Sequence, residues 1–255
     1  MASAPLGRPV VLGAGPVSTA VVAELIARGH RPTVVTRSGT ALGGVDAKAA
    51  DMADPVAAKA ALAKATAVFQ CAQPPYHRWV TDFPALQESV LTGCEASGAT
   101  LIAVENLYGY GSPSTAITEG QPFAPTTNKG RVRVEMAQAL AASHDAGRVP
   151  TAAVRAADFI GPGVRQSVFG QRFFGALANG RPAQVIGNPD ARRSVTYIPD
   201  LARALVALAA EPGCWGQAWI APSAPSVSPR QMAGQANKGG SIRSVARWQL
   251  RLAGL

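Results

Sequence analysis

Two cations stand four residues apart in the segment APTTNKGRVR, which covers residues 124–133. At this spacing Lys129 and Arg133 fall on one face of a helix. A lysine that faces a pocket can donate a proton to a substrate oxygen, and a charged one can polarise a carbonyl group. The same spacing also fits a solvated helix face with no chemical role, and the residues alone leave both interpretations open.

The loop after the apolar run TLIAVEN (100–106) carries further groups that can handle protons. Asn106 can hydrogen-bond a substrate oxygen, and Tyr108 is the phenol we favour as proton donor, with Tyr110 close behind it. Glu105 either pairs with Lys129 or Arg133 or lies at the strand end facing solvent. We therefore predict a reaction site built from this loop and the helix that carries Lys129.

A glycine-rich turn near the N-terminus has the context of a dinucleotide-binding turn. The segment VLGAGPVSTA follows an apolar strand pattern and opens a helical one. Gly13 permits the tight turn, and Gly15 lets the backbone approach a pyrophosphate. The pyrophosphate then faces the free N–H groups of the helix N-terminus, where Pro16 and Val17 are the first residues and are expected to border the cofactor. Ser18 takes the place of the third glycine of the fingerprint, and its small size is compatible with close helix–strand packing.

The end of the second predicted strand indicates which dinucleotide binds. NAD sites usually place an acidic residue there, whereas this chain reads Thr36-Arg37-Ser38. Arg37 can pair with a 2′-phosphate, and Ser38 can donate a further hydrogen bond to it. We predict NADP as the cofactor, with NAD less favoured. The alternative for Arg37 is a solvated loop residue.

Alternating strand and helix patterns must position these groups. Strands are predicted at 9–13, 31–37, 45–52, 67–72, 100–106 and within 149–158, and helices at 17–28, 54–65, 80–97 and 128–145. Such alternation predicts an α/β fold, a Rossmann doubly wound parallel sheet. We assign residues 1–158 to this dinucleotide-binding core. We assign residues 159–255 to a small, shortened substrate-side cap with a basic C-terminal helix, the two forming a single structural unit.

Taken together, the motifs resemble those of the extended or atypical short-chain dehydrogenase/reductases, the NAD-dependent epimerase/dehydratase family. The matching segments are GAGPVSTA, FQCAQPPY, VENLYGYG, TEGQPFAP, AADFIGPGV and VTYIPDLARAL, spread over about residues 10–221. The resemblance implies a Rossmann fold and a nicotinamide cofactor running along Ala72, Gln73, Pro74 and Pro75. It also implies a serine or threonine and a Tyr-x-x-x-Lys pair in catalysis. Here the corresponding positions hold Asn106, Lys129 and Arg133.

The cap region contributes candidate substrate-binding residues. Asp158 follows the sixth predicted strand and is expected either to face the pocket or to cap its own turn. Arg193 and Tyr197 precede the IPD segment and are expected to line the substrate pocket. Because the chain is shorter here than family members usually are, the pocket could be open, or a second copy of the chain in a homodimer could cover it.

Charge and composition limit the remaining function classes. The net charge of +9 includes a tail from Gln231 in which Arg243, Arg247 and Arg251 recur every four residues. We interpret this as a solvated helix face and not a nucleic-acid site, because no aromatic platform or nucleic-acid motif accompanies it. No apolar run is long enough to span a membrane. Three scattered cysteines and no recognisable signal peptide or metal-ligand cluster favour a metal-free cytoplasmic protein.

Three functions fit these observations. We favour an NADP-dependent oxidoreductase or epimerase acting on a small carbonyl or hydroxyl compound. A non-redox isomerase, cyclase or dehydratase that retains the nucleotide comes second, because the usual tyrosine and lysine are replaced. A non-enzymatic NADP-sensing binding protein comes third, suggested by the same replacement and the basic tail.

Overall fold

The structure is a computed structural model that describes residues 6–236 and 241–245. It divides into two compact units. The first contains residues 1–156 and 199–221, and the second contains residues 157–198 and 222–255. All predicted cofactor and catalytic residues fall in the first unit, whereas Asp158, Arg193 and Tyr197 fall in the second.

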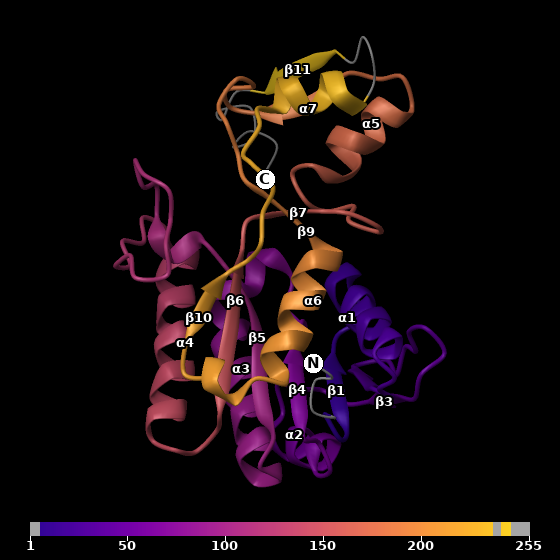
Figure 1. The fold of residues 1–255 in the computed structure, drawn as a ribbon, viewed down its shortest axis with the longest axis vertical. Coiled ribbons are helices and arrows are strands. Elements are labelled where there is room, and N and C mark those ends of the chain that lie inside the picture. Colours follow the sequence, from indigo (N-terminus) through magenta and orange to yellow (C-terminus); the bar gives the residue numbers. More distant parts are fainter. Residues whose placement is uncertain (1–5, 237–240, 246–255) are drawn as a thin grey trace. The chain divides into compact units, whose positions relative to one another are not determined.

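A seven-stranded sheet, in which every pairing is parallel, forms the first unit (Figure 1). The strand order is β10-β6-β5-β4-β1-β2-β3. The chain therefore builds outward in one direction from β1 to β3 and in the other from β4 to β6, and the order reverses between β1 and β4. The strands are β1 (Pro9–Leu12), β2 (Thr33–Thr36), β3 (Ala47–Ala49), β4 (Ala67–Gln70), β5 (Thr100–Asn106), β6 (Thr151–Ala156) and β10 (Ala218–Ile220).

The helices of this unit begin and end at residues suited to those positions. Asp54 caps α2 by accepting a 2.9 Å hydrogen bond from the Val56 N–H, and Thr127 caps α4 by accepting one of 3.0 Å from Gly130. Gly98, with φ of 70°, ends α3. The helices are α1 (Pro16–Ala27), α2 (Pro55–Leu62), α3 (Trp79–Ser97), α4 (Asn128–Asp145) and α6 (Ile198–Ala209), and short 3-10 turns lie at η1 (Tyr76–Arg78), η2 (Tyr108–Tyr110) and η4 (Pro212–Cys214).

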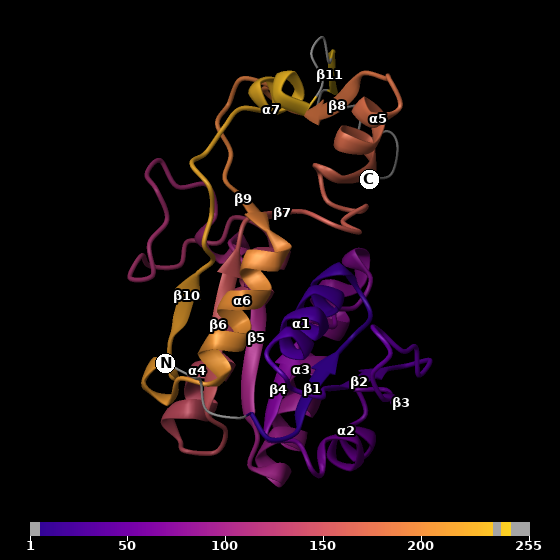
Figure 2. The ribbon, with the colours of Figure 1, turned by 45° about the vertical axis from the view of Figure 1, so that its right-hand side comes forward.

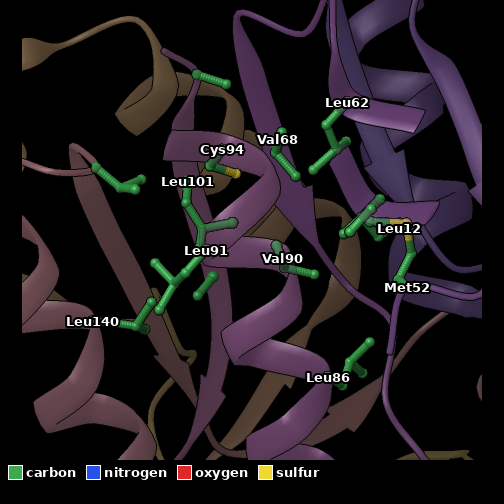
Figure 3. Close-up of a cluster of buried hydrophobic side chains, with 14 of the residues drawn as sticks. Leu12, Met52, Leu62, Val68, Leu86, Val90, Leu91, Cys94, Leu101 and Leu140 are labelled. Carbon is green, nitrogen blue, oxygen red and sulfur yellow. The ribbon is translucent and has the colours of Figure 1, made fainter. Parts of the chain in front are cut away.

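Side chains that alternate along the strands supply a core on each face of the sheet. One set packs against α2, α3 and α4, as the close-up in Figure 3 shows for Leu12, Val68 and Leu101. The alternate set, which includes Val11 and Phe69, is also fully buried and supplies the core of the opposite face. Figure 2 shows α1 and α6 side by side on one face of the sheet. Each fully buried leucine or valine contributes roughly 1.5–3 kcal/mol relative to an exposed one, so the sheet is a rigid base for the loops at its strand ends.

Two small parallel sheets and a separate apolar cluster form the second unit. β7 (Asp158–Ile160) pairs with β9 (Val195–Tyr197), and β8 (Ala183–Ile186) pairs with β11 (Ile242–Val245). The π-helical turn η3 (Gly170–Phe174) and the helices α5 (Gly175–Ala178) and α7 (Pro229–Ala236) complete the unit. Its core contains Phe169, Phe173, Leu177, Val185 and Met232.

The Rossmann doubly wound sheet confirms the predicted fold class, but two features of the C-terminal region differ from the prediction. Residues 199–221, expected in the cap, return to the first unit, because the apolar face of α6 is buried there and β10 extends the sheet beside β6. The basic C-terminal helix is not observed where Arg243 lies, since this residue sits in β11 and is paired with β8. Arg247 and Arg251 lie outside the described residues.

Candidate functional site

The turn between β1 and α1 has the geometry that the glycine pattern predicts. Gly13 has φ of 98°, and a Cβ placed on it would lie 3.1 Å from the Ala72 Cα, so only glycine fits without strain. A Cβ on Gly15 would meet no described atom within 4 Å. Gly15 is the N-cap of α1 and no side chain of the described chain caps this helix. The first-turn N–H groups of Val17 and Ser18 therefore have no hydrogen-bond acceptor among the described residues.

Arg37 and Ser38 lie in a second turn, which follows β2. The turn is held by a 2.8 Å hydrogen bond from the Thr40 N–H to the Thr36 hydroxyl and by a 2.6 Å contact between the Ser38 and Thr40 hydroxyls. Arg37 is exposed and forms no ion pair within the described part of the chain. β1 and β2 are neighbours, so this turn and the glycine turn lie at the same edge of the sheet.

The loop after β4 lies beside the glycine turn. Its Ala72 backbone packs against Gly13, and Gln73 is exposed. The Pro74 carbonyl accepts a 3.1 Å hydrogen bond from the indole N–H of Trp79. Burial raises the pKa of the Cys71 thiol to about 12, and a hydrogen bond to Ser18 offsets this only in part. Cys71 is therefore a protonated thiol and not a nucleophile.

Lys129 and Tyr108 lie together at the start of α4, with Tyr76 between them. The Lys129 ammonium lies 3.9 Å from the centre of the Tyr76 ring, and the Tyr76 and Tyr108 hydroxyls are 3.5 Å apart. The Asn106 side chain accepts a 3.0 Å hydrogen bond from the Tyr108 N–H, which fixes the start of η2. Gly130 allows the close approach, since a Cβ there would be 2.7 Å from the Tyr108 carbonyl oxygen.

Arg133 lies apart from this group, in the layer between α3, α4 and β5. It is 6% exposed, and its guanidinium lies 4.7 Å above the Phe83 ring and donates a 3.3 Å hydrogen bond to the Val104 carbonyl. Burial lowers the pKa of Arg133, while the charge of Glu105 opposes that change. Lys129 and Arg133, at adjacent turns of one helix, thus occupy different environments.

Glu105 pairs with a cation on the neighbouring strand. Its carboxylate accepts a 2.9 Å hydrogen bond from Arg155, which also donates one of 2.6 Å to the Tyr110 hydroxyl. Burial disfavours the charge of Arg155, but Glu105 and Tyr110 outweigh it and raise its pKa. Both interpretations of Glu105 are wrong, because its ion-pair partner is Arg155 and not Lys129 or Arg133, and its side chain is buried and does not face solvent.

The second unit places two of the three predicted substrate residues on one small sheet and the third just before one of its strands. Asp158 and Tyr197 lie on the paired strands β7 and β9, and Arg193 is two residues before β9. The Arg193 guanidinium donates a 2.8 Å hydrogen bond to the Ile186 carbonyl. Although Asp158 as a residue is exposed, loss of water around its carboxyl group raises its pKa, and the charge of Arg193 offsets this only in part.

A pocket of about 380 Å³ lies elsewhere in the first unit, between α4, β6 and β10. Glu105, Glu119 and Arg155 line it, and none of the predicted site residues does. In this pocket one Glu105 oxygen pairs with Arg155 and Glu119 accepts a hydrogen bond from the Ile220 N–H, so the pocket is a feature separate from the predicted site. The described residues contain no cluster of acidic, histidine or cysteine side chains that could hold a metal. None of their helices has both the length and the apolarity of a membrane span.

Two aromatic residues at this site were missed by sequence reasoning. Tyr76 and Trp79 follow the proline pair after β4. Their rings contact each other, the Trp79 ring contacts that of Tyr108, and the Tyr76 hydroxyl lies 3.5 Å from the Tyr108 hydroxyl. The signal that could have found them is the aromatic content of the segment PPYHRW, which directly follows a strand end at the predicted cofactor edge.

Comparisons with known proteins agree with this geometry. Residues 10–214 match the model of the NAD dependent epimerase/dehydratase family. A comparison with curated proteins finds no significant match.

Several solved structures share the fold. UDP-glucose 4-epimerase from Brucella ovis in complex with NAD is 21% identical, with a TM-score of 0.81, covering 94% of this chain and 86% of that one. DesIV, a dTDP-glucose 4,6-dehydratase from Streptomyces venezuelae with NAD and TYD bound, is 18% identical, with a TM-score of 0.81 and coverage of 94% and 84%. UDP-N-acetylglucosamine 4-epimerase from Bacillus cereus is 16% identical, with a TM-score of 0.80 and the same coverage. At these identities the likeness establishes the fold alone.

Proposed function

The chain belongs to the NAD dependent epimerase/dehydratase family, which consists of enzymes of the short-chain dehydrogenase/reductase type, and we propose that it is an NADP-dependent oxidoreductase or epimerase. Its substrate in this proposal is a small carbonyl or hydroxyl compound. The observation that carries the proposal is the uncapped start of α1 behind Gly13 and Gly15. A glycine-lined helix N-terminus with free N–H groups is a site for a pyrophosphate.

The residues present fit a nicotinamide dinucleotide. Gly15 leaves open the space that a pyrophosphate needs, and the loop of Ala72, Gln73 and Pro74 packs directly beside the turn. We assign the adenosine end to Arg37 and Ser38. The solved relatives named above are NAD complexes where a cofactor is stated, but an exposed arginine with no acidic partner in the described chain favours a 2′-phosphate.

The reaction end is assigned to the loop after β5 and the first turn of α4. When bound, the dinucleotide supplies the hydride acceptor or donor. Tyr108 exchanges a proton with the substrate oxygen, Asn106 hydrogen-bonds that oxygen, and the Lys129 charge polarises it. Arg133 was predicted as catalytic. Its burial against Phe83 and its bond to the Val104 carbonyl favour a positioning role, holding the strand end that carries Asn106.

The second unit is assigned to the substrate, with Asp158, Arg193 and Tyr197 as contacts. Ten of the 24 basic residues but only two of the 15 acidic ones fall in this unit, which leaves it a net charge of +8 out of the +9 of the chain. Such an imbalance favours a negatively charged substrate. The nucleotide-sugar names of the solved relatives are consistent with that chemistry.

Calorimetry with NADP⁺ and NAD⁺ tests the cofactor assignment. The R37A variant is expected to weaken NADP⁺ binding by about 10–100-fold, since it removes a charge-assisted pair with a phosphate, and to leave NAD⁺ binding nearly unchanged. Arg31, an exposed arginine at the other end of β2, gives the matched control R31A, which should alter neither affinity. Tighter binding of NAD⁺ than of NADP⁺ by the wild type would refute the preference, and no binding of either would refute the function.

Lys129 at the position of the family's tyrosine favours a second candidate. In a reaction without net hydride transfer, such as an isomerisation, cyclisation or dehydration, the nucleotide would stay bound as a cofactor and would not be consumed. Substrate conversion with no lasting change in nicotinamide absorbance would support this candidate, whereas NADPH consumption equal to product formed would exclude it.

A further inference from the structure

Tyr76 connects the two groups that the proposed reaction site depends on. Its ring lies under the Lys129 ammonium at 3.9 Å, and its hydroxyl lies 3.5 Å from that of Tyr108. These residues come from three separate segments, namely η1 after β4, η2 after β5, and the first turn of α4. The fold thus brings three chain segments together at the Tyr76 phenol, which is the arrangement that a shared role in the reaction site requires.

Trp79 packs against both phenol rings and so fixes Tyr76 and Tyr108 relative to each other. It is 8% exposed, its indole N–H is bound to the Pro74 carbonyl, and its ring centre lies 5.0 Å from Tyr76 and 5.9 Å from Tyr108. On its inner side it packs on Phe83 at 5.4 Å. The phenols are therefore fixed to the same loop that borders the glycine turn, while both remain open to solvent, with Tyr76 at 55% and Tyr108 at 40% exposure.

We propose that Tyr76 is a second catalytic phenol, which relays the proton between Tyr108 and solvent beside the Lys129 charge, with Trp79 as its positioning residue. This inference rests on the proposed function and deepens it. It answers how a chain with lysine at the usual tyrosine position can still move a proton, because the phenol is supplied by the loop after β4. A cation over the ring face is attracted to it and holds the ring in place.

The relay is balanced in the oxidising direction. The substrate hydroxyl gives its proton to the Tyr108 oxygen as Tyr108 gives its own to the Tyr76 oxygen and Tyr76 releases one to water. The carbon–hydrogen bond breaks with its electron pair, which passes as hydride to the oxidised nicotinamide dinucleotide. The substrate carbon is oxidised to a carbonyl, the dinucleotide is reduced, and both tyrosines end as they began.

One test measures kinetics with NADPH and a panel of phosphorylated and neutral ketones. Y76F keeps the ring over which Lys129 sits and removes only the hydroxyl, so it is expected to lower kcat by at least about 100-fold while the KM for NADPH stays within about twofold of wild type. T81V is the control. It removes an exposed hydroxyl near the start of α3, where that group bonds the Arg78 carbonyl and the Asp82 carboxylate, and kcat should stay close to wild type. A Y76F enzyme with unchanged kcat would overturn the relay.

A second test needs no turnover. N-acetylimidazole acetylates accessible phenols, and mass spectrometry locates the label. Tyr76 should react at similar rates in the free protein and with saturating NADP⁺, because the relay needs its hydroxyl open to water when the cofactor is bound, while the buried Tyr110 stays unlabelled in both. If calorimetry shows NADP⁺ bound and the labelling of Tyr76 is at least tenfold slower, the relay to solvent fails and the proposed function stands. If no dinucleotide binds, both fail. Where no ketone in the panel is turned over, the labelling result decides alone.

Discussion

At the scale of single residues, two aspartates of the second unit have pKa values shifted in opposite directions. Loss of water around the carboxyl raises the pKa of Asp158, whereas a hydrogen bond from Arg230 lowers that of the exposed Asp190. The folded state therefore binds the Asp158 proton more tightly, and the Asp190 proton less tightly, than the unfolded chain does. The first shift lowers the free energy of unfolding as the pH rises above about 3.9, and the second raises it as the pH rises toward about 3.9 from below.

The variants D158N and D190N should show this difference in sign. At pH 7, D158N is expected to raise Tm because it removes a carboxylate that folding disfavours, and D190N is expected to lower it. The D158N difference should vanish as the pH falls toward about 4, where the wild-type carboxyl is protonated, whereas the D190N difference should persist there and shrink only at lower pH, because Arg230 lowers the pKa of Asp190. Thermal unfolding followed by circular dichroism from pH 2 to 8 gives the comparison. A D158N protein less stable than wild type at pH 7 would mean that the pairing with Arg193 outweighs the desolvation.

The residue assignments that sequence could make were those with a local signature. Gly13, Gly15 and Arg37 follow strand ends in patterns that carry their own physical reason, and Lys129 was singled out by its spacing. Tyr76 was not, because its importance comes from Lys129 and Tyr108, which are 53 and 32 positions away in the chain. Only the sheet, which sets β4 beside β5, brings these segments together.

At the scale of elements, the two glycines of the β1–α1 turn have different roles, one in the fold and one in the proposed binding of the cofactor. Gly13 is needed by the fold, since its φ of 98° and its 3.1 Å approach to Ala72 both exclude a side chain. Gly15 has φ of −79° and open space around it, so alanine fits there without strain. In the proposed function that space is taken by the pyrophosphate.

We therefore expect G13A and G15A to fail in different ways. G13A should lower the free energy of unfolding by about 1–3 kcal/mol through backbone strain. G15A should change it by less than about 1 kcal/mol yet weaken NADP⁺ binding by at least about tenfold. Urea unfolding and calorimetry on both variants separate these effects. A G15A protein that binds NADP⁺ like wild type would remove the pyrophosphate from this turn.

Elements with strong periodicity were predicted from the sequence, and elements defined by their partners were not. The strands and helices from β1 to β6 follow from apolar runs and capping residues such as Asp54. β10 has three residues, and it becomes a strand because β6 offers it a parallel edge. Arg243 shows the reverse error, since a four-residue spacing of arginines suggested a helix where pairing with β8 gives a strand.

At the scale of the whole molecule, the net charge is distributed unequally between the two units, which also have different proposed functions. The second unit carries a net charge of +8, and the first, which contains 14 basic and 13 acidic residues, carries +1. In the proposed function, the dinucleotide site lies in a nearly neutral unit, and local groups such as Arg37 and the α1 N-terminus are assigned to its binding. The long-range field comes from the unit assigned to the substrate.

Salt should accordingly affect one class of substrate and not the other. For two ketones that share a skeleton, one phosphorylated and one neutral, kcat/KM of the phosphorylated ketone is expected to fall by about tenfold between 0.1 and 1 M NaCl. The screening length shrinks from about 10 to 3 Å over this range, which removes steering by the basic unit. The neutral ketone serves as the control, because any effect of salt on the fold or on NADPH binding reaches both substrates alike. Equal salt dependence of the two would mean that the charge of the second unit serves some purpose other than gathering an anionic substrate.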